Sequence, residues 1–155
     1  RPGTQNVAGI VGLAEALRPA HDEPAEAAPR LRILRDRLEA GLRERVPGMQ
    51  VNGHPERRLP NILNVSFDGA DGESLMMALD VKGVAVSTGA ACSAGSTEPS
   101  HVLRAMGLSS RRAGSSLRYS PGHTTTEDDI ERAVNITAEV VSRLRSFAGV
   151  ERAAG

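Results

Sequence analysis

Residues 84–107 read VAVSTGAACSAGSTEPSHVLRAMG and contain the only cysteine of the chain, Cys92. The apolar pattern of 83–88 predicts a buried strand, and that of 98–107 predicts a helix. Between them, residues 88–98 carry only small side chains before a final glutamate. Because such a segment has little apolar area to bury, we expect an accessible loop that carries the thiol between the strand and the helix.

The segments around this stretch predict the fold class. Apolar residues three and four apart indicate helices, and alternating apolar residues indicate strands. The remaining predicted helices cover 5–18, 30–46, 72–80 and a final stretch from Thr126, and the remaining predicted strands cover 49–53, 60–67 and 115–120. This order favours an α+β fold in which helices pack on a small, mostly antiparallel sheet.

In the strand 60–67, the apolar Leu63, Val65 and Phe67 alternate with Asn64 and Ser66. Asp71 is expected to cap the helix 72–80, and Thr126 with Asp129 to form a variant of the capping box. The expected inner face of the final helix is made of Ile130, Val134, Thr137, Val141 and Leu144.

Composition excludes several classes of function. The 155 residues are enough for one domain with a real core, and 19 basic residues balance 19 acidic ones, which argues against a nucleic-acid partner. Aromatic residues make up 2%, too few for stacking on single-stranded bases, and no apolar run is long enough to cross a membrane. A single cysteine excludes an internal disulfide and fits a reducing compartment, so we expect a cytoplasmic location.

From the residues alone, more than one chemistry remains open for Cys92. A buried structural thiol fits poorly with its small neighbours, and a zinc site fits poorly with four scattered histidines, so no metal site is expected. A cysteine hydrolase would need a base such as His101 or His123. No Lys, Arg or His lies within five residues of Cys92, so any group that stabilises its thiolate comes from elsewhere.

Arg118 is the second candidate, on the predicted strand 115–120. Its neighbours Leu117 and Tyr119 take the opposite face of that strand. The side chain is either a solvated strand arginine or a guanidinium fork for a substrate carboxylate, and the pattern alone does not choose between them.

Five segments, in order, resemble cysteine desulfurases of the NifS/IscS type. They are RPGTQN at 1–6, PNILNVSF at 60–67, the cysteine stretch at 84–107, SSLRYSPG at 115–122 and TTEDDI at 125–130. The resemblance runs from Arg1 to about Arg145, and the long cysteine loop is similar to the IscS group rather than to the SufS group.

The resemblance implies a pyridoxal-phosphate enzyme of fold type I that takes sulfur from L-cysteine and releases alanine. It makes Cys92 the nucleophile that carries the persulfide, Arg118 the residue that binds the substrate carboxylate, and Thr4 a contact to the cofactor phosphate of the neighbouring subunit in a homodimer. It also implies a sulfur-acceptor protein, such as an iron–sulfur scaffold, as the partner.

One required group does not match. The family's cofactor lysine precedes the RxGTxN segment, on a large domain, and Lys82, the only lysine here, matches no cofactor position. We therefore expect residues 1–20 to form a connecting helix, 21–148 the C-terminal small domain with loop 88–98, and 149–155 a frayed tail. Val7, Ile10, Val11 and Leu17 of the connecting helix are not expected all to face the sheet of this small domain. Alone, such a piece is expected to be inactive, and a stand-alone binding module for a sulfur acceptor is the alternative.

Overall fold

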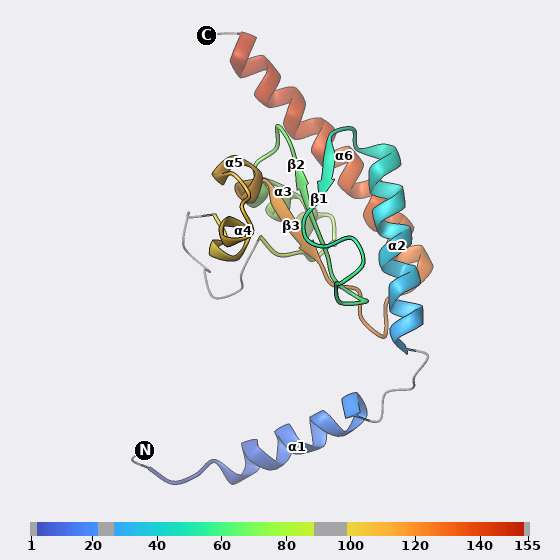
Figure 1. Cartoon of the computed structure of the whole chain (residues 1–155), viewed down its shortest axis with the longest axis vertical. Coiled ribbons are helices and arrows are strands. Elements are labelled where there is room, and N and C mark those ends of the chain that lie inside the picture. The colour runs from blue at the N-terminus through green and yellow to red at the C-terminus, as the bar shows by residue number, and fades with distance from the viewer. Residues whose placement is uncertain (1–2, 22–26, 89–98, 154–155) are drawn as a thin grey trace.

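The computed structural model describes residues 3–21, 27–88 and 99–153 of the chain (Figure 1). The elements, in order, are α1 (Val7–His21), α2 (Ala27–Arg45), β1 (Met49–Val51), β2 (Leu63–Phe67), α3 (Gly72–Val81), α4 (His101–Ala105), α5 (Ser110–Gly114), β3 (Ser116–Tyr119) and α6 (Glu127–Ala153). Helices packed on one small antiparallel sheet confirm the predicted α+β fold.

The three strands form a sheet in the order β1-β2-β3, with both pairs antiparallel. Because strand side chains alternate between faces, the register separates two sets of residues. Leu63 and Val65 lie on the same face as Leu117 and Tyr119, and all four are buried. Arg118 pairs with Asn64 on the opposite, polar face.

Helices α2 and α6 lie along one side of the sheet, and α4 and α5 lie on the other (Figure 1). The two long helices approach closely, since a Cβ atom built at Gly41 would come within 2.9 Å of Val134 Cγ2. The expected inner face of α6 is confirmed. It comprises the buried Ile130, Val134, Thr137 and Val141 and the partly buried Leu144.

Local capping explains where α3 and α6 begin. Asp71 accepts a hydrogen bond from the Ser74 N–H at 2.9 Å, as an N-cap residue does. At α6, Thr126 and Asp129 bond reciprocally, which is the capping-box arrangement expected from the sequence. These hydrogen bonds lower the pKa of the Asp129 carboxyl.

The structure contradicts the prediction on both sides of the cysteine segment. The stretch 83–88 is not a strand, because within it only Ser87 pairs with β3. Strand β3 has four residues, so it offers few backbone groups with which a further strand could pair. The helix predicted over 98–107 begins at His101, because Ser100 caps it and accepts from the Leu103 N–H.

The structure also differs at two other places. The short helix α5, capped by Ser109, was not predicted, because its five residues are too few to show an apolar period. Residues 149–153, expected to be a frayed tail, continue α6.

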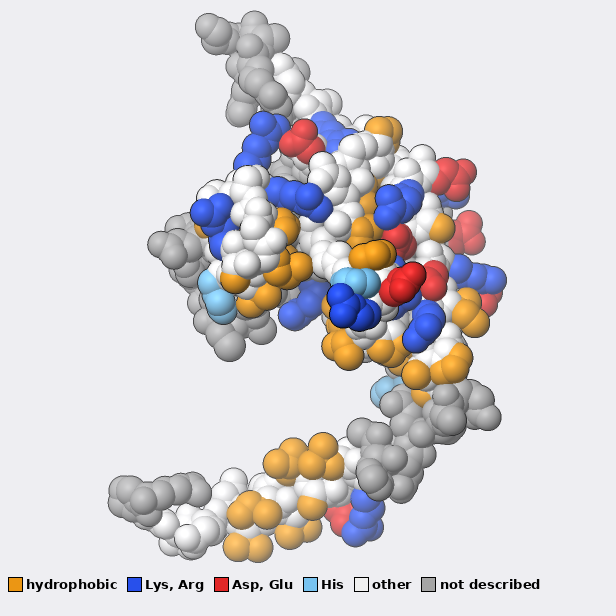
Figure 2. All heavy atoms as spheres, viewed as in Figure 1, with side chains coloured by type: hydrophobic (Ala, Val, Ile, Leu, Met, Phe, Trp, Pro, Cys, Tyr) orange, Lys and Arg blue, Asp and Glu red, His pale blue; other side chains and the backbone are white. Residues whose placement is uncertain are grey.

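Helix α1 carries apolar side chains that the rest of the described chain does not cover. It stands apart from the sheet in Figure 1, and Figure 2 shows hydrophobic side chains along it. Val7, Ile10, Val11 and Leu17 are 54–64% exposed. This confirms the expectation that these residues do not pack on the sheet of this domain.

Gly72, the first residue of α3, is expected to tolerate no side chain. An added Cβ would lie 2.5 Å from the Gly114 carbonyl oxygen, a backbone atom that cannot turn aside. We expect Gly72→Ala to lower the free energy of unfolding by about 1–3 kcal/mol, measured by urea denaturation.

Gly114→Ala is the matched control, because a Cβ at that position meets nothing within 4 Å. Equal stability of the two variants would contradict this close packing of α3 against the C-terminal end of α5.

Candidate functional site

Arg118 lies on the polar face of the sheet, on β3. Asn64 lies opposite it on β2, and Ser87 pairs with it on the other side. The Arg118 N–H donates to the Ser87 carbonyl at 2.8 Å, and the Ser87 N–H donates back at 3.2 Å. The half-buried side chain takes part in none of the ion pairs found among the described residues.

Ser87, which pairs with Arg118, precedes the segment that contains Cys92. Cys92 falls within 89–98, which lie outside the described residues, and so does most of the predicted loop 88–98. It nevertheless follows Ser87 by only five residues. A chain of five residues spans at most about 18 Å, which sets the reach of the segment from Ser87.

The other end of this segment is anchored as well. Ser100, the N-cap of α4, is buried, and α4 contributes the buried Leu103 on the same side of the sheet as α5 (Figure 1). The thiol-bearing segment therefore joins two fixed points, Ser87 beside β3 and Ser100 at α4.

Thr4 and Lys82 are not brought to this place among the described residues. Thr4 is exposed and precedes α1, the helix that stands apart from the sheet (Figure 1). Lys82 lies at the end of α3, where its Nζ atom donates to both carboxylate oxygens of Glu139 at 2.9 and 3.1 Å. The sheet thus holds Arg118 and the start of the cysteine segment, without a lysine.

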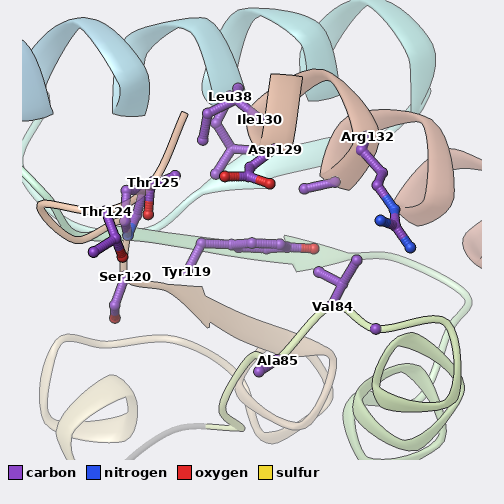
Figure 3. A pocket seen from close by; sticks show the side chains of 13 residues that line it. Leu38, Val84, Ala85, Tyr119, Ser120, Thr124, Thr125, Asp129, Ile130 and Arg132 are labelled. Carbon is purple, nitrogen blue, oxygen red and sulfur yellow. The ribbon is translucent and has the colours of Figure 1, made fainter. Parts of the chain in front are cut away.

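A cavity of about 280 Å³ lies on the opposite face, between β3, residues 83–85 and the start of α6 (Figure 3). Tyr119 lies along it, and burial raises the pKa of its phenol well above the ordinary value while its hydroxyl bonds Thr137 at 3.0 Å. The Asp129 carboxylate at the rim is already bonded to Thr126. Since Arg118 points to the other face, this cavity is separate from the candidate site.

Sequence reasoning missed a set of polar residues around Arg118. Asn52, Asn64, Ser66, Arg112 and Ser116 are linked by hydrogen bonds on the polar face of the sheet. In the sequence, Asn64 was interpreted only as the polar position of an alternating strand. Asparagine is depleted in strands, which is the one signal that could have marked it.

The family model described as aminotransferase class-V matches residues 1–133. The chain belongs to the aminotransferase class-V family. Two curated members are similar over 147 residues, or 95% of this chain. Cysteine desulfurase IscS of Edwardsiella ictaluri is 48% identical, and that of Methanosarcina thermophila is 45% identical. The chain spans 36% of the length of each of these class-V relatives.

Solved structures agree with this membership. A NifS-like protein superposes with a TM-score of 0.77 at 36% identity, covering 92% of this chain and 35% of its own. The desulfurase CsdA of Escherichia coli, 23% identical with a TM-score of 0.68, covers 92% of this chain and 32% of its own and shows the shared fold. The resemblance to NifS- and IscS-type proteins is therefore confirmed.

Two further findings concern the described part of the chain. Its His, Cys, Asp and Glu side chains form no group of three or more that could hold a metal ion. None of its helices is both long enough and apolar enough to cross a membrane.

Proposed function

We propose that this chain is the part of a pyridoxal-phosphate-dependent cysteine desulfurase that binds the substrate carboxylate and accepts the sulfur. The observation that carries the proposal is the backbone pairing of Ser87 with Arg118. It sets the residue five positions before Cys92 directly beside the arginine, which supports roles for both residues in one site. The similarity to curated desulfurases over 95% of the chain supports the same assignment.

In this proposal, Cys92 acts as a thiolate on the sulfur of L-cysteine. A new S–S bond forms as the substrate C–S bond breaks, and the electron pair of that bond stays with the carbon fragment, which takes up a proton and leaves as alanine. The sulfur of Cys92 is oxidised and the substrate carbon is reduced, so no outside oxidant is needed. Arg118 holds the substrate carboxylate with two charge-assisted hydrogen bonds and thereby fixes the position of the sulfur.

The residues described here do not form a cofactor site by themselves. Attachment of pyridoxal phosphate needs an amine, and the only lysine, Lys82, is committed to Glu139. We propose that the cofactor, which supplies an electron sink when bound, is held mainly by parts of the protein beyond this chain. Thr4 remains a proposed contact to its phosphate across a homodimer.

A protein that acts as a sulfur acceptor, such as an iron–sulfur scaffold, is the proposed partner, and the cytoplasm is the proposed location. An accessible persulfide needs an acceptor thiol or cluster-assembly site to receive its sulfur. The curated relatives carry the name IscS, which supports this direction.

Product analysis tests the proposed reaction. The complete enzyme, supplied with L-cysteine and a thiol reductant, is expected to release alanine and sulfide in equal amounts, quantified by amino-acid chromatography and a sulfide assay. Release of pyruvate or of an oxo acid without alanine would mean an elimination or an amino transfer, and would overturn the desulfurase assignment.

A further inference from the structure

The polar face of the sheet carries a chain of hydrogen bonds that leads from Arg112 to the neighbour of Arg118. Arg112 on α5 donates from Nε to Asn52 Oδ1 at 2.9 Å and from Nη2 to the Val51 carbonyl at 3.0 Å. Asn52 then donates from Nδ2 to Asn64 Oδ1 at 2.7 Å. Hydrogen bonds thus join Arg112 on α5, Asn52 just after β1 and Asn64 on β2 in one chain.

Arg112 fixes the direction of every bond in this chain. A guanidinium only donates, so the Asn52 atom that faces it is the oxygen. The other end of the same amide is then an NH₂ group, which makes its partner on Asn64 the carbonyl oxygen. The NH₂ group of Asn64 therefore turns away from Asn52, and no described residue accepts from it.

The chain is also held rigidly. Asn52 is buried, and its Nδ2 also reaches Ser116 Oγ at 3.1 Å, while Ser66 lies within hydrogen-bond reach of both Asn52 and Arg112. Rotating the Asn64 amide would place two NH₂ groups face to face in a partly buried setting, which costs a lost hydrogen bond and leaves a donor unpaired. The orientation of Asn64 is therefore fixed before any ligand arrives.

Asn64 is the residue directly opposite Arg118. The Arg118 N–H and C=O both bond Ser87, so Asn64 and Arg118 form a non-hydrogen-bonded pair, the kind in which facing side chains lie closest. Cβ atoms in such pairs are about 4.5–5.5 Å apart. A fixed amide donor and a guanidinium fork thus lie side by side on one face.

We infer that Asn64 is a substrate-binding residue, whose Nδ2 donates to the same carboxylate that Arg118 binds. This inference rests on the proposed function and extends it. A carboxylate offers about four lone-pair sites, of which a guanidinium fork fills two, so a third donor has a place to bind. The site would select an amino acid with a free α-carboxylate, and Arg112 acts through Asn52 to hold the donor in position.

Two variants of Asn64 separate this role from a structural one. Asn64→Ala removes the donor and is expected to raise the KM for L-cysteine in the complete enzyme by about 10- to 100-fold with little change in kcat. Asn64→Asp keeps the shape and the oxygen that accepts from Asn52, but it replaces the donor with a negative charge. The Asp variant is therefore expected to raise KM more than the Ala variant.

The matched control is Asn61→Ala, three residues earlier and outside this hydrogen-bonded chain, which is expected to leave KM unchanged. A carboxylate-free competitor, 2-aminoethanethiol, is expected to bind wild type and Asn64→Ala equally well. If Asn64→Asp retains the wild-type KM, Asn64 is structural and the inference is wrong. The same follows if Asn64→Ala weakens the binding of the competitor as much as that of L-cysteine.

The same assay keeps the inference distinct from the proposed function. If Arg118→Ala raises KM while both Asn64 variants match wild type, only the role of Asn64 fails. If Arg118→Ala itself leaves KM unchanged, no carboxylate is bound here and the inference fails together with the proposed role of Arg118.

Discussion

Replacing Cys92 with serine is expected to abolish persulfide formation and alanine release in the complete enzyme, while substrate binding stays intact. A hydroxyl is protonated at neutral pH and is a far weaker nucleophile toward sulfur than a thiolate, so the S–S bond cannot form. Binding depends on other groups, among them the proposed carboxylate site at Arg118. Assays of alanine release measure the loss of activity. The change in the absorption spectrum on adding L-cysteine measures substrate binding.

Ser93→Ala is the control for this substitution, because it changes the next residue of the same segment and keeps the thiol. It is expected to retain activity. Persistent alanine release by Cys92→Ser at the wild-type rate would assign the nucleophile to another residue, and loss of the binding spectrum would make Cys92 a binding residue.

Arg118→Ala is expected to weaken substrate capture and to leave the sulfur chemistry of bound substrate largely unchanged. Truncating one partner of a hydrogen-bonded charge pair costs on the order of 2–4 kcal/mol, which corresponds to roughly a 30- to 1,000-fold rise in KM. Arg118→Lys keeps the charge and loses the two-pronged geometry, so its KM is expected to fall between those of wild type and Arg118→Ala. Steady-state kinetics with L-cysteine measure both variants.

An arginine elsewhere on the surface provides the comparison. Arg111 on α5 is exposed and paired with Asp68 at 2.7 Å, so Arg111→Ala is expected to leave KM near the wild-type value. A fall in kcat with an unchanged KM in Arg118→Ala, matching the defect of Cys92→Ser, would contradict the separate roles of these two residues.

The parts of the fold that local sequence determines were predicted correctly. The alternation of Leu63, Val65 and Phe67 specified β2 and its buried face, and Asp71 and Thr126 marked the starts of α3 and α6. In these places the backbone and its immediate neighbours supply the decisive interactions. A reader of the sequence can therefore find them without knowing the tertiary structure.

The parts that depend on distant residues were not predictable in the same way. Ser87 pairs with Arg118, which lies 31 positions later in the sequence. The structure has this single pairing where a strand was predicted over 83–88. The direction of the Asn64 amide depends on Arg112, 48 positions away on a helix that the periodicity did not reveal. The proposed roles of Cys92 and Arg118 came from the resemblance, since spacing alone left both residues with more than one interpretation.

Sulfur mapping after a single turnover tests the central claim most directly. The complete enzyme is mixed with less than one equivalent of L-cysteine labelled with a heavy sulfur isotope, quenched with an alkylating agent, digested and analysed by mass spectrometry. The account predicts one labelled sulfur atom on the peptide that contains Cys92, in an amount equal to the alanine released. Alanine release with the label on another residue, or with no labelled persulfide on Cys92, would contradict it.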